Sequence, residues 1–140
     1  MRDRDCELVK AAKNDYAVVH RLMPEKTCDE AFLTAVCYHY QQAIEKLLKA
    51  LIGNSGNQYE YTHDISKLCY KCEQCKIELP GELDLFATTL TDWEAKTRYN
   101  SSICATIKQL SLAEKIYNEL LLLLDGNASK KSTTERIDAF

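Results

Sequence analysis

The feature that most constrains the fold is a long run with helical periodicity that begins near Cys28 and ends at Gly53. Thr27 and Glu30 have the Thr-x-x-Glu spacing of a capping box, which satisfies free amides at a helix start, and glycine commonly follows a helix end. Apolar residues recur within the run at three- and four-residue steps, so a helix places them on one side. They are Leu33, Val36, Cys37, Tyr40, Ile44, Leu47, Leu48 and Leu51. A helix of about 25 residues would extend roughly 37 Å, the length of a small bundle.

The remainder of the chain also has a composition typical of helices. Only four glycines and two prolines occur in 140 residues, and these residues most disfavour a helix interior. A first helix is expected over 3–23 and ends at Pro24, because the residue before a proline avoids helical geometry. The sequence therefore predicts an all-α protein, an up-and-down bundle of four to five helices. One domain is expected over 1–127, followed by a loose polar tail over 128–140.

The limits of the later helices are predicted from local signals. Thr62 is expected to cap a third helix, with His63 and Asp64 in its first turn. A fourth helix closes at residues 98–100. Ser101 or Ser102 is expected to cap a fifth helix, and the Asp-Gly-Asn sequence at 125–127 is expected to stop it.

A row of polar side chains accompanies the apolar face of the long run. It consists of His39, Gln42, Glu45, Lys46 and Lys49. The favoured interpretation for any one of them is the solvated flank of a core helix, with Lys49 on the wet face. A sharper interpretation is that His39, Gln42 and Lys46 face a groove.

Three cysteines with a two-residue spacing, Cys69, Cys72 and Cys75, resemble part of an iron–sulfur motif. Leu79 stands where the fourth thiolate would be, and the three cysteines share one apolar arc of a helix that extends to this leucine. Because a free cysteine behaves as a small buried hydrophobe, we predict a core role, no metal and no cofactor. Seven cysteines without an apolar leader segment favour reduced thiols and a cytoplasmic location. No apolar run is long enough to span a membrane.

Residues 38–51, Tyr-His-Tyr-Gln-Gln-Ala-Ile-Glu-Lys-Leu-Leu-Lys-Ala-Leu, form the most specific motif in the chain. The motif resembles the second helix of HEPN domains (higher eukaryotes and prokaryotes nucleotide-binding). Thr62-His63-Asp64-Ile65 is similar to the Thr-His-Asp-Leu that follows the next loop in that family. Arg98-Tyr99-Asn100 is similar to the triplet that closes the fourth helix of the family. In element order, the resemblance covers roughly residues 4–124.

The resemblance implies a function but also exposes a missing residue. In HEPN ribonucleases the arginine that closes the fourth helix is followed, after four to six residues, by a histidine. Arg98 matches that arginine, but Ile103, Cys104 and Ala105 occupy the allowed histidine positions. We therefore predict no catalytic residue and a non-catalytic HEPN module that binds a nucleotide or RNA, or that pairs with a small nucleotidyltransferase in a two-gene, toxin–antitoxin-like system. The alternatives are a divergent ribonuclease or toxin that uses Arg98 and Cys104, and a purely structural dimeric module.

The candidate ligand-binding residues are those polar side chains that fall within the resembling motifs. They are His39, Gln42, Lys46, His63, Asp64, Arg98, Tyr99 and Asn100. The amides after Thr62, at a helix start, are a further candidate for a phosphate site. A net charge of −3 argues against broad, unspecific binding to nucleic acid.

A two-fold homodimer is also expected. Tyr38, Tyr40, Trp93 and Tyr99 form a high aromatic load for one face of a small monomer, and such residues are enriched at interfaces. The resemblance independently implies side-by-side dimers. The alternative is that the tyrosines fill the bundle core.

Overall fold

The computed structural model describes the backbone of residues 1–23, 30–99 and 103–138, with side chains up to residue 126 except that of residue 30. Five helices make up this part of the chain. They are α1 (Asp3–Leu22), α2 (Glu30–Asn54), α3 (Ile65–Gln74), α4 (Gly81–Arg98) and α5 (Ile107–Asp138). The described residues contain no strand. The predicted all-α bundle is confirmed.

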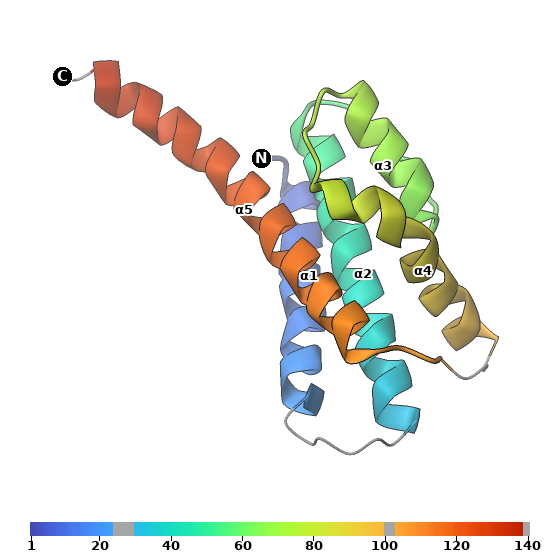
Figure 1. The fold of residues 1–140 in the computed structure, drawn as a ribbon. Helices are drawn as coiled ribbons and strands as arrows, with labels where there is room; N and C mark the ends of the chain where they lie inside the picture. The colour runs from blue at the N-terminus through green and yellow to red at the C-terminus, as the bar shows by residue number, and fades with distance from the viewer. Residues whose placement is uncertain (24–29, 100–102, 139–140) are drawn as a thin grey trace.

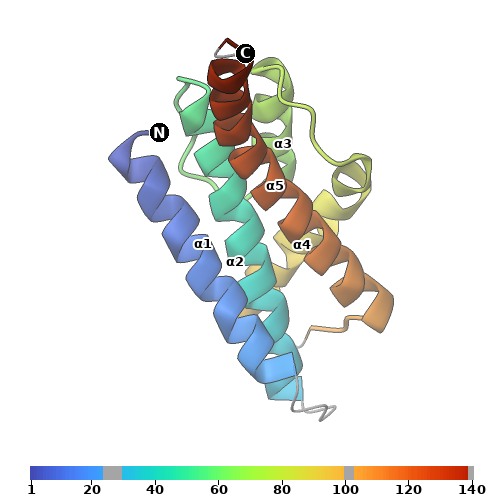
Figure 2. The same cartoon turned by 90° about the vertical axis from the view of Figure 1, so that its left-hand side faces the viewer.

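The long run forms the centre of the bundle. Helix α2 packs against each of the other four helices (Figure 1, Figure 2). Its side chains Ile44, Leu47 and Leu48 are fully buried, as the periodicity predicts. The predicted cap at Thr27 and Glu30 lies outside the described side chains. None of the helices in the described part of the chain is both long and apolar enough to cross a bilayer.

The end of α2 differs from the prediction. Gly53 lies inside the helix, and the residue with left-handed geometry is Gly56, with φ of 87°. The Asn57 amide donates to the Ile52 carbonyl (3.3 Å) and the Gly56 amide to the Gly53 carbonyl (3.0 Å), the two bonds of a Schellman motif. Gly53 is required for another reason: a Cβ there would collide with the buried Asp5 carboxylate of α1.

Helix α3 begins and ends elsewhere than expected. Its cap is Asp64 rather than Thr62, because the Asp64 carboxylate accepts from the Lys67 amide at 3.3 Å. Thr62 stays outside the helix and accepts from the Asp64 amide at 3.0 Å. The helix stops at Gln74, five residues before Leu79, since Lys76 adopts a left-handed φ of 60°.

Helix α5 starts later and ends later than predicted. Thr106 and Gln109 form a reciprocal capping box, in which each backbone amide donates to the other's side chain at 3.0–3.1 Å. The predicted caps Ser101 and Ser102 lie outside the described residues. The helix does not stop at residues 125–127, and the predicted loose tail is helical to Asp138. A single interior glycine costs only about 1 kcal/mol, so Gly126 does not end the helix. Its C-terminal part projects beyond the bundle (Figure 1).

Candidate functional site

The predicted site residues His39 and Lys46 meet at one carboxylate. Asp15 of α1 receives both: its Oδ1 lies 2.8 Å from His39 Nδ1, and its Oδ2 accepts from Lys46 Nζ at 2.5 Å. His39 and Lys46 are seven residues apart, so they lie on one side of α2 two turns apart. The carboxylate is mostly buried. The sequence gives no signal for Asp15, because its pairing with α2 is purely long-range.

A second cluster surrounds Glu45, whose side chain is only 4% exposed. Its carboxylate lies 2.8 Å from His63 Nδ1 and accepts from Lys49 Nζ at 3.1 Å and from Gln41 Nε2 at 3.0 Å. Gln42 joins this cluster by donating to the Gln41 side-chain oxygen at 2.7 Å. The cluster therefore links α2 to the segment before α3.

The placement of Lys49 on a wet face is wrong. Its side chain is 11% exposed, because Glu45 one turn earlier holds the ammonium group. The ring of Tyr59 also approaches to 5.9 Å from Nζ. In both clusters a lysine thus faces a carboxylate, and the opposite charges compensate each other. Such internally paired cations are poorly placed to attract a phosphate.

A third cluster, which the sequence analysis missed, joins three helices. Glu114 of α5 accepts from the Tyr16 hydroxyl of α1 and from the Tyr40 hydroxyl of α2 (2.8 Å), and lies 3.3 Å from His20 Nε2. Burial raises the pKa of Glu114, but the hydrogen bonds from these partners outweigh it and lower the pKa below its usual value. Burial and the Glu114 carboxylate raise the pKa of Tyr40. An ionised carboxylate between neutral phenols is a stable cross-link, which points to a structural role.

The remaining predicted residues lie at the end of α4. Arg98 Nη2 is 3.6 Å from the buried Glu94 carboxylate, and its guanidinium lies 5.1 Å from the centre of the Tyr99 ring. Tyr99 is 73% exposed. Asn100 lies outside the described residues. Among the residues that the structure describes, no hydrogen bond or ion pair joins Arg98 to His39, Lys46 or His63. The predicted set therefore divides into separate groups.

Asp64 and the start of α3 have a local role. Asp64 caps the helix, and the Ile65 amide donates to the Thr91 hydroxyl at 3.0 Å. The amides of residues 64, 65 and 67 are thus already paired within the chain. A phosphate at this helix start would have to displace these bonds.

The cysteines of α3 belong to the core. Cys69 and Cys72 are buried, and burial raises the pKa of each thiol to about 12. Cys75 follows the helix end and is half-buried. Within the described residues, no three histidine, cysteine, aspartate or glutamate side chains converge on a possible metal position.

The aromatic residues are distributed differently from the prediction of one exposed face. Tyr40 and Trp93 are buried in the core of the single chain, where Trp93 packs edge-on against Phe86. Tyr38 is half-buried, which leaves Tyr99 as the strongly exposed member of the predicted set.

Comparison with known proteins gave one match. A family model described as HEPN domain matches residues 7–124. Neither the curated proteins nor the solved structures yielded a match.

Proposed function

The chain belongs to the HEPN domain family, whose functions involve nucleotides or RNA. We propose that it is a non-catalytic module that binds a nucleotide or RNA. The residues that follow α4 support the proposal that the module is non-catalytic. Arg98 is present, but Ile103 is buried and Cys104 is an exposed thiol, so no imidazole stands at the family spacing. A ribonuclease of this type needs a group that orients or activates the ribose hydroxyl beside the cation.

Arg98 and Tyr99 are the members of the predicted site that best support ligand contact. Both side chains are exposed, and the Arg98–Glu94 pair is longer than the pairs of Lys46 and Lys49, so the guanidinium stays accessible. A guanidinium beside an aromatic ring suits a phosphate next to a base. The clusters of Asp15 and Glu45 fix helices, and we assign His39, Gln42, Lys46 and His63 to positioning rather than direct contact.

The wild-type protein is expected to bind RNA without cleaving it. A labelled single-stranded RNA should be retained by the chain and recovered intact. Arg98→Ala should weaken retention about tenfold, because one charge-assisted contact is lost, whereas Arg98→Lys should lose less, because the cation beside Glu94 is kept. Cleavage that disappears in Arg98→Ala would contradict the proposal and establish the divergent ribonuclease. If the RNA is neither bound nor cleaved, the result favours the purely structural module.

We further propose a cytoplasmic two-fold homodimer that pairs with a small nucleotidyltransferase. Six cysteines of the described part of the chain are free thiols, which suits a reducing compartment. Large apolar side chains are exposed on α5, among them Ile107 and Leu122, as expected of a helical face that a second chain covers.

Native mass spectrometry tests this assembly. The purified chain is expected at twice its own mass, and protein from the native host should also carry a nucleotidyltransferase. A spectrum at micromolar concentration with only the single-chain mass would rule out the dimer. A host-derived sample with only chain multiples would rule out the nucleotidyltransferase.

A further inference from the structure

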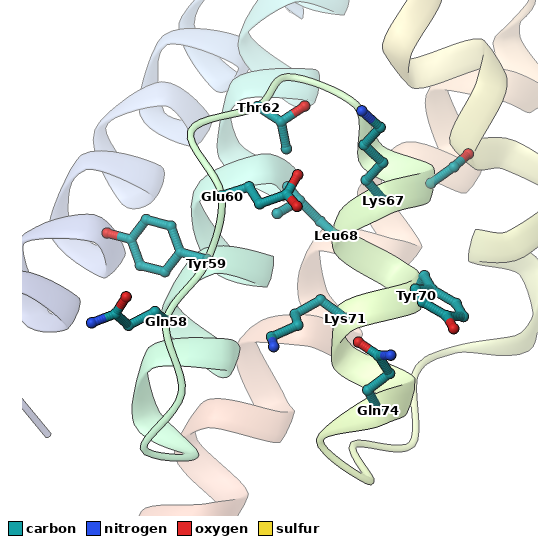
Figure 3. A pocket seen from close by; sticks show the side chains of 10 residues that line it. Gln58, Tyr59, Glu60, Thr62, Lys67, Leu68, Tyr70, Lys71 and Gln74 are labelled. Carbon is teal, nitrogen blue, oxygen red and sulfur yellow. The ribbon is translucent and has the colours of Figure 1, made fainter.

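An open hollow of about 620 Å³ lies between α3 and the segment 58–62 that leads into it (Figure 3). The volume lies within the range of small-molecule sites. Side chains that line the hollow include Lys67, Lys71, Glu60, Gln58, Gln74 and Tyr70. None of these six residues was singled out by the sequence motifs, because the hollow depends on the path of a loop beside a helix.

Both walls of the hollow are held from behind. The segment 58–62 is anchored by Tyr59, whose ring centre lies 4.9 Å from the Arg4 guanidinium. The next residue after the segment, His63, contacts the buried Glu45 carboxylate at 2.8 Å. Helix α3 is anchored by Leu68 and Cys72 in the core. The hollow is therefore preformed, so a ligand need not order either wall.

The hollow carries two lysines without a carboxylate partner. Lys67 and Lys71 form no ion pair among the described residues, whereas Lys46 and Lys49 are each engaged by a carboxylate. The two lysines are four residues apart on α3, which places their Cβ atoms about 5–6 Å apart. In Figure 3, Lys71 reaches from α3 toward the segment that carries Gln58 and Glu60. The charged residues that line the hollow are these two lysines and Glu60, so the hollow is locally cationic although the chain has a net charge of −3.

We infer that this hollow binds a nucleoside phosphate, either as a free nucleotide or as part of a single-stranded RNA; the inference rests on the proposed function. Lys67 and Lys71 hold the phosphate. The Glu60 carboxylate accepts from ribose hydroxyls, and the amides of Gln58 and Gln74 donate to and accept from the base edge. Tyr70 is 63% exposed and offers a ring face for stacking.

The composition of the hollow favours this ligand over a simple anion. A site for inorganic phosphate or an acidic peptide has no use for a carboxylate, whereas the ribose hydroxyls of a nucleoside phosphate can donate to Glu60 while Lys67 and Lys71 face the phosphate. A nucleoside phosphate combines an anionic end with donors and a flat ring, and each part has a complement among the six side chains. The hollow is separate from Arg98 and Tyr99, neither of which lines it.

Titration of the full chain with ATP, a short single-stranded RNA, pyrophosphate and poly-glutamate tests the inference. Lys67→Ala/Lys71→Ala is expected to weaken ATP and RNA binding by about tenfold or more, since two charge-assisted contacts are lost. The matched control is Lys10→Ala/Lys13→Ala, which removes two exposed lysines of α1 and changes the net charge equally. It should leave affinity within about twofold. Tyr70→Ala should weaken ATP and RNA binding but leave pyrophosphate binding unchanged.

The outcomes separate this site from the proposed function. If wild-type protein binds neither ATP nor RNA, both are wrong. If it binds and Lys67→Ala/Lys71→Ala binds equally well, the hollow is not the site, while the proposed function stands. Equal affinity for poly-glutamate would overturn recognition of a nucleoside. If Lys67→Ala/Lys71→Ala weakens only ATP binding or only RNA binding, the affected ligand is the source of the nucleoside phosphate that the hollow accepts. The helical circular dichroism of each variant shows whether the bundle is retained, and both lysines lie on the accessible side of α3.

Discussion

Glu45→Ala is expected to lower the free energy of unfolding by about 3 kcal/mol, the lower end of the cost of breaking a buried ion pair. The substitution removes the acceptor for Lys49, Gln41 and His63 at once. Lys49 would then be left as a largely buried ammonium group without a counter-charge. His63 would lose the contact that ties the segment before α3 to α2.

Urea unfolding of wild type and variant measures this loss. The matched control is Glu82→Ala, which breaks an exposed pair with Lys115 and is expected to change stability little. The double variant Glu45→Leu/Lys49→Leu should recover part of the loss, because removal of both charges leaves no buried ion unpaired. Equal midpoints for Glu45→Ala and Glu82→Ala would show that the Glu45 cluster does not hold the bundle together.

Leu47→Ala is expected to cost about 2–5 kcal/mol, because it leaves a cavity at the centre of the bundle. Leu47 is fully buried on α2, the helix that contacts all four others. Leu85 of α4 provides the control, since it is 90% exposed and its replacement by alanine should change stability by less than about 0.5 kcal/mol. Thermal or urea unfolding measures both variants. Similar losses would mean that the assigned faces of α2 or α4 are wrong.

The core of α2 was predictable because periodicity is a local property of the sequence. Ile44, Leu47 and Leu48 recur at helical steps and are buried in the structure. Helix limits were less predictable, because several residues near each end have the chemistry of a cap. Asp64 competes successfully with Thr62, and Gly56 rather than Gly53 supplies the left-handed residue. Thr106 and Gln109 have the spacing of a capping box, but the serines shortly before them have the same capping chemistry, so the sequence does not single out the true start of α5.

The candidate site was predictable only in part, because its partners are distant in the chain. His39 and Lys46 share a side of α2, as their spacing requires, but Asp15 lies 24 and 31 residues away from them. The burial of Lys49 depends on Glu45 and on the path of the segment that carries Tyr59. The hollow beside α3 likewise depends on that path. No local pattern encodes such a path, so these features emerge only from the folded chain.

Association of the wild-type chain with a labelled single-stranded RNA, measured at roughly 50 and 200 mM salt, tests the proposed function most directly. Saturable binding that weakens as salt rises is expected, because lysine and arginine contacts to phosphates release counterions. The RNA should be recovered at full length from the bound fraction. Absence of saturable binding of both this RNA and ATP at either salt concentration, or recovery of cleaved RNA, would contradict a non-catalytic nucleotide- or RNA-binding module.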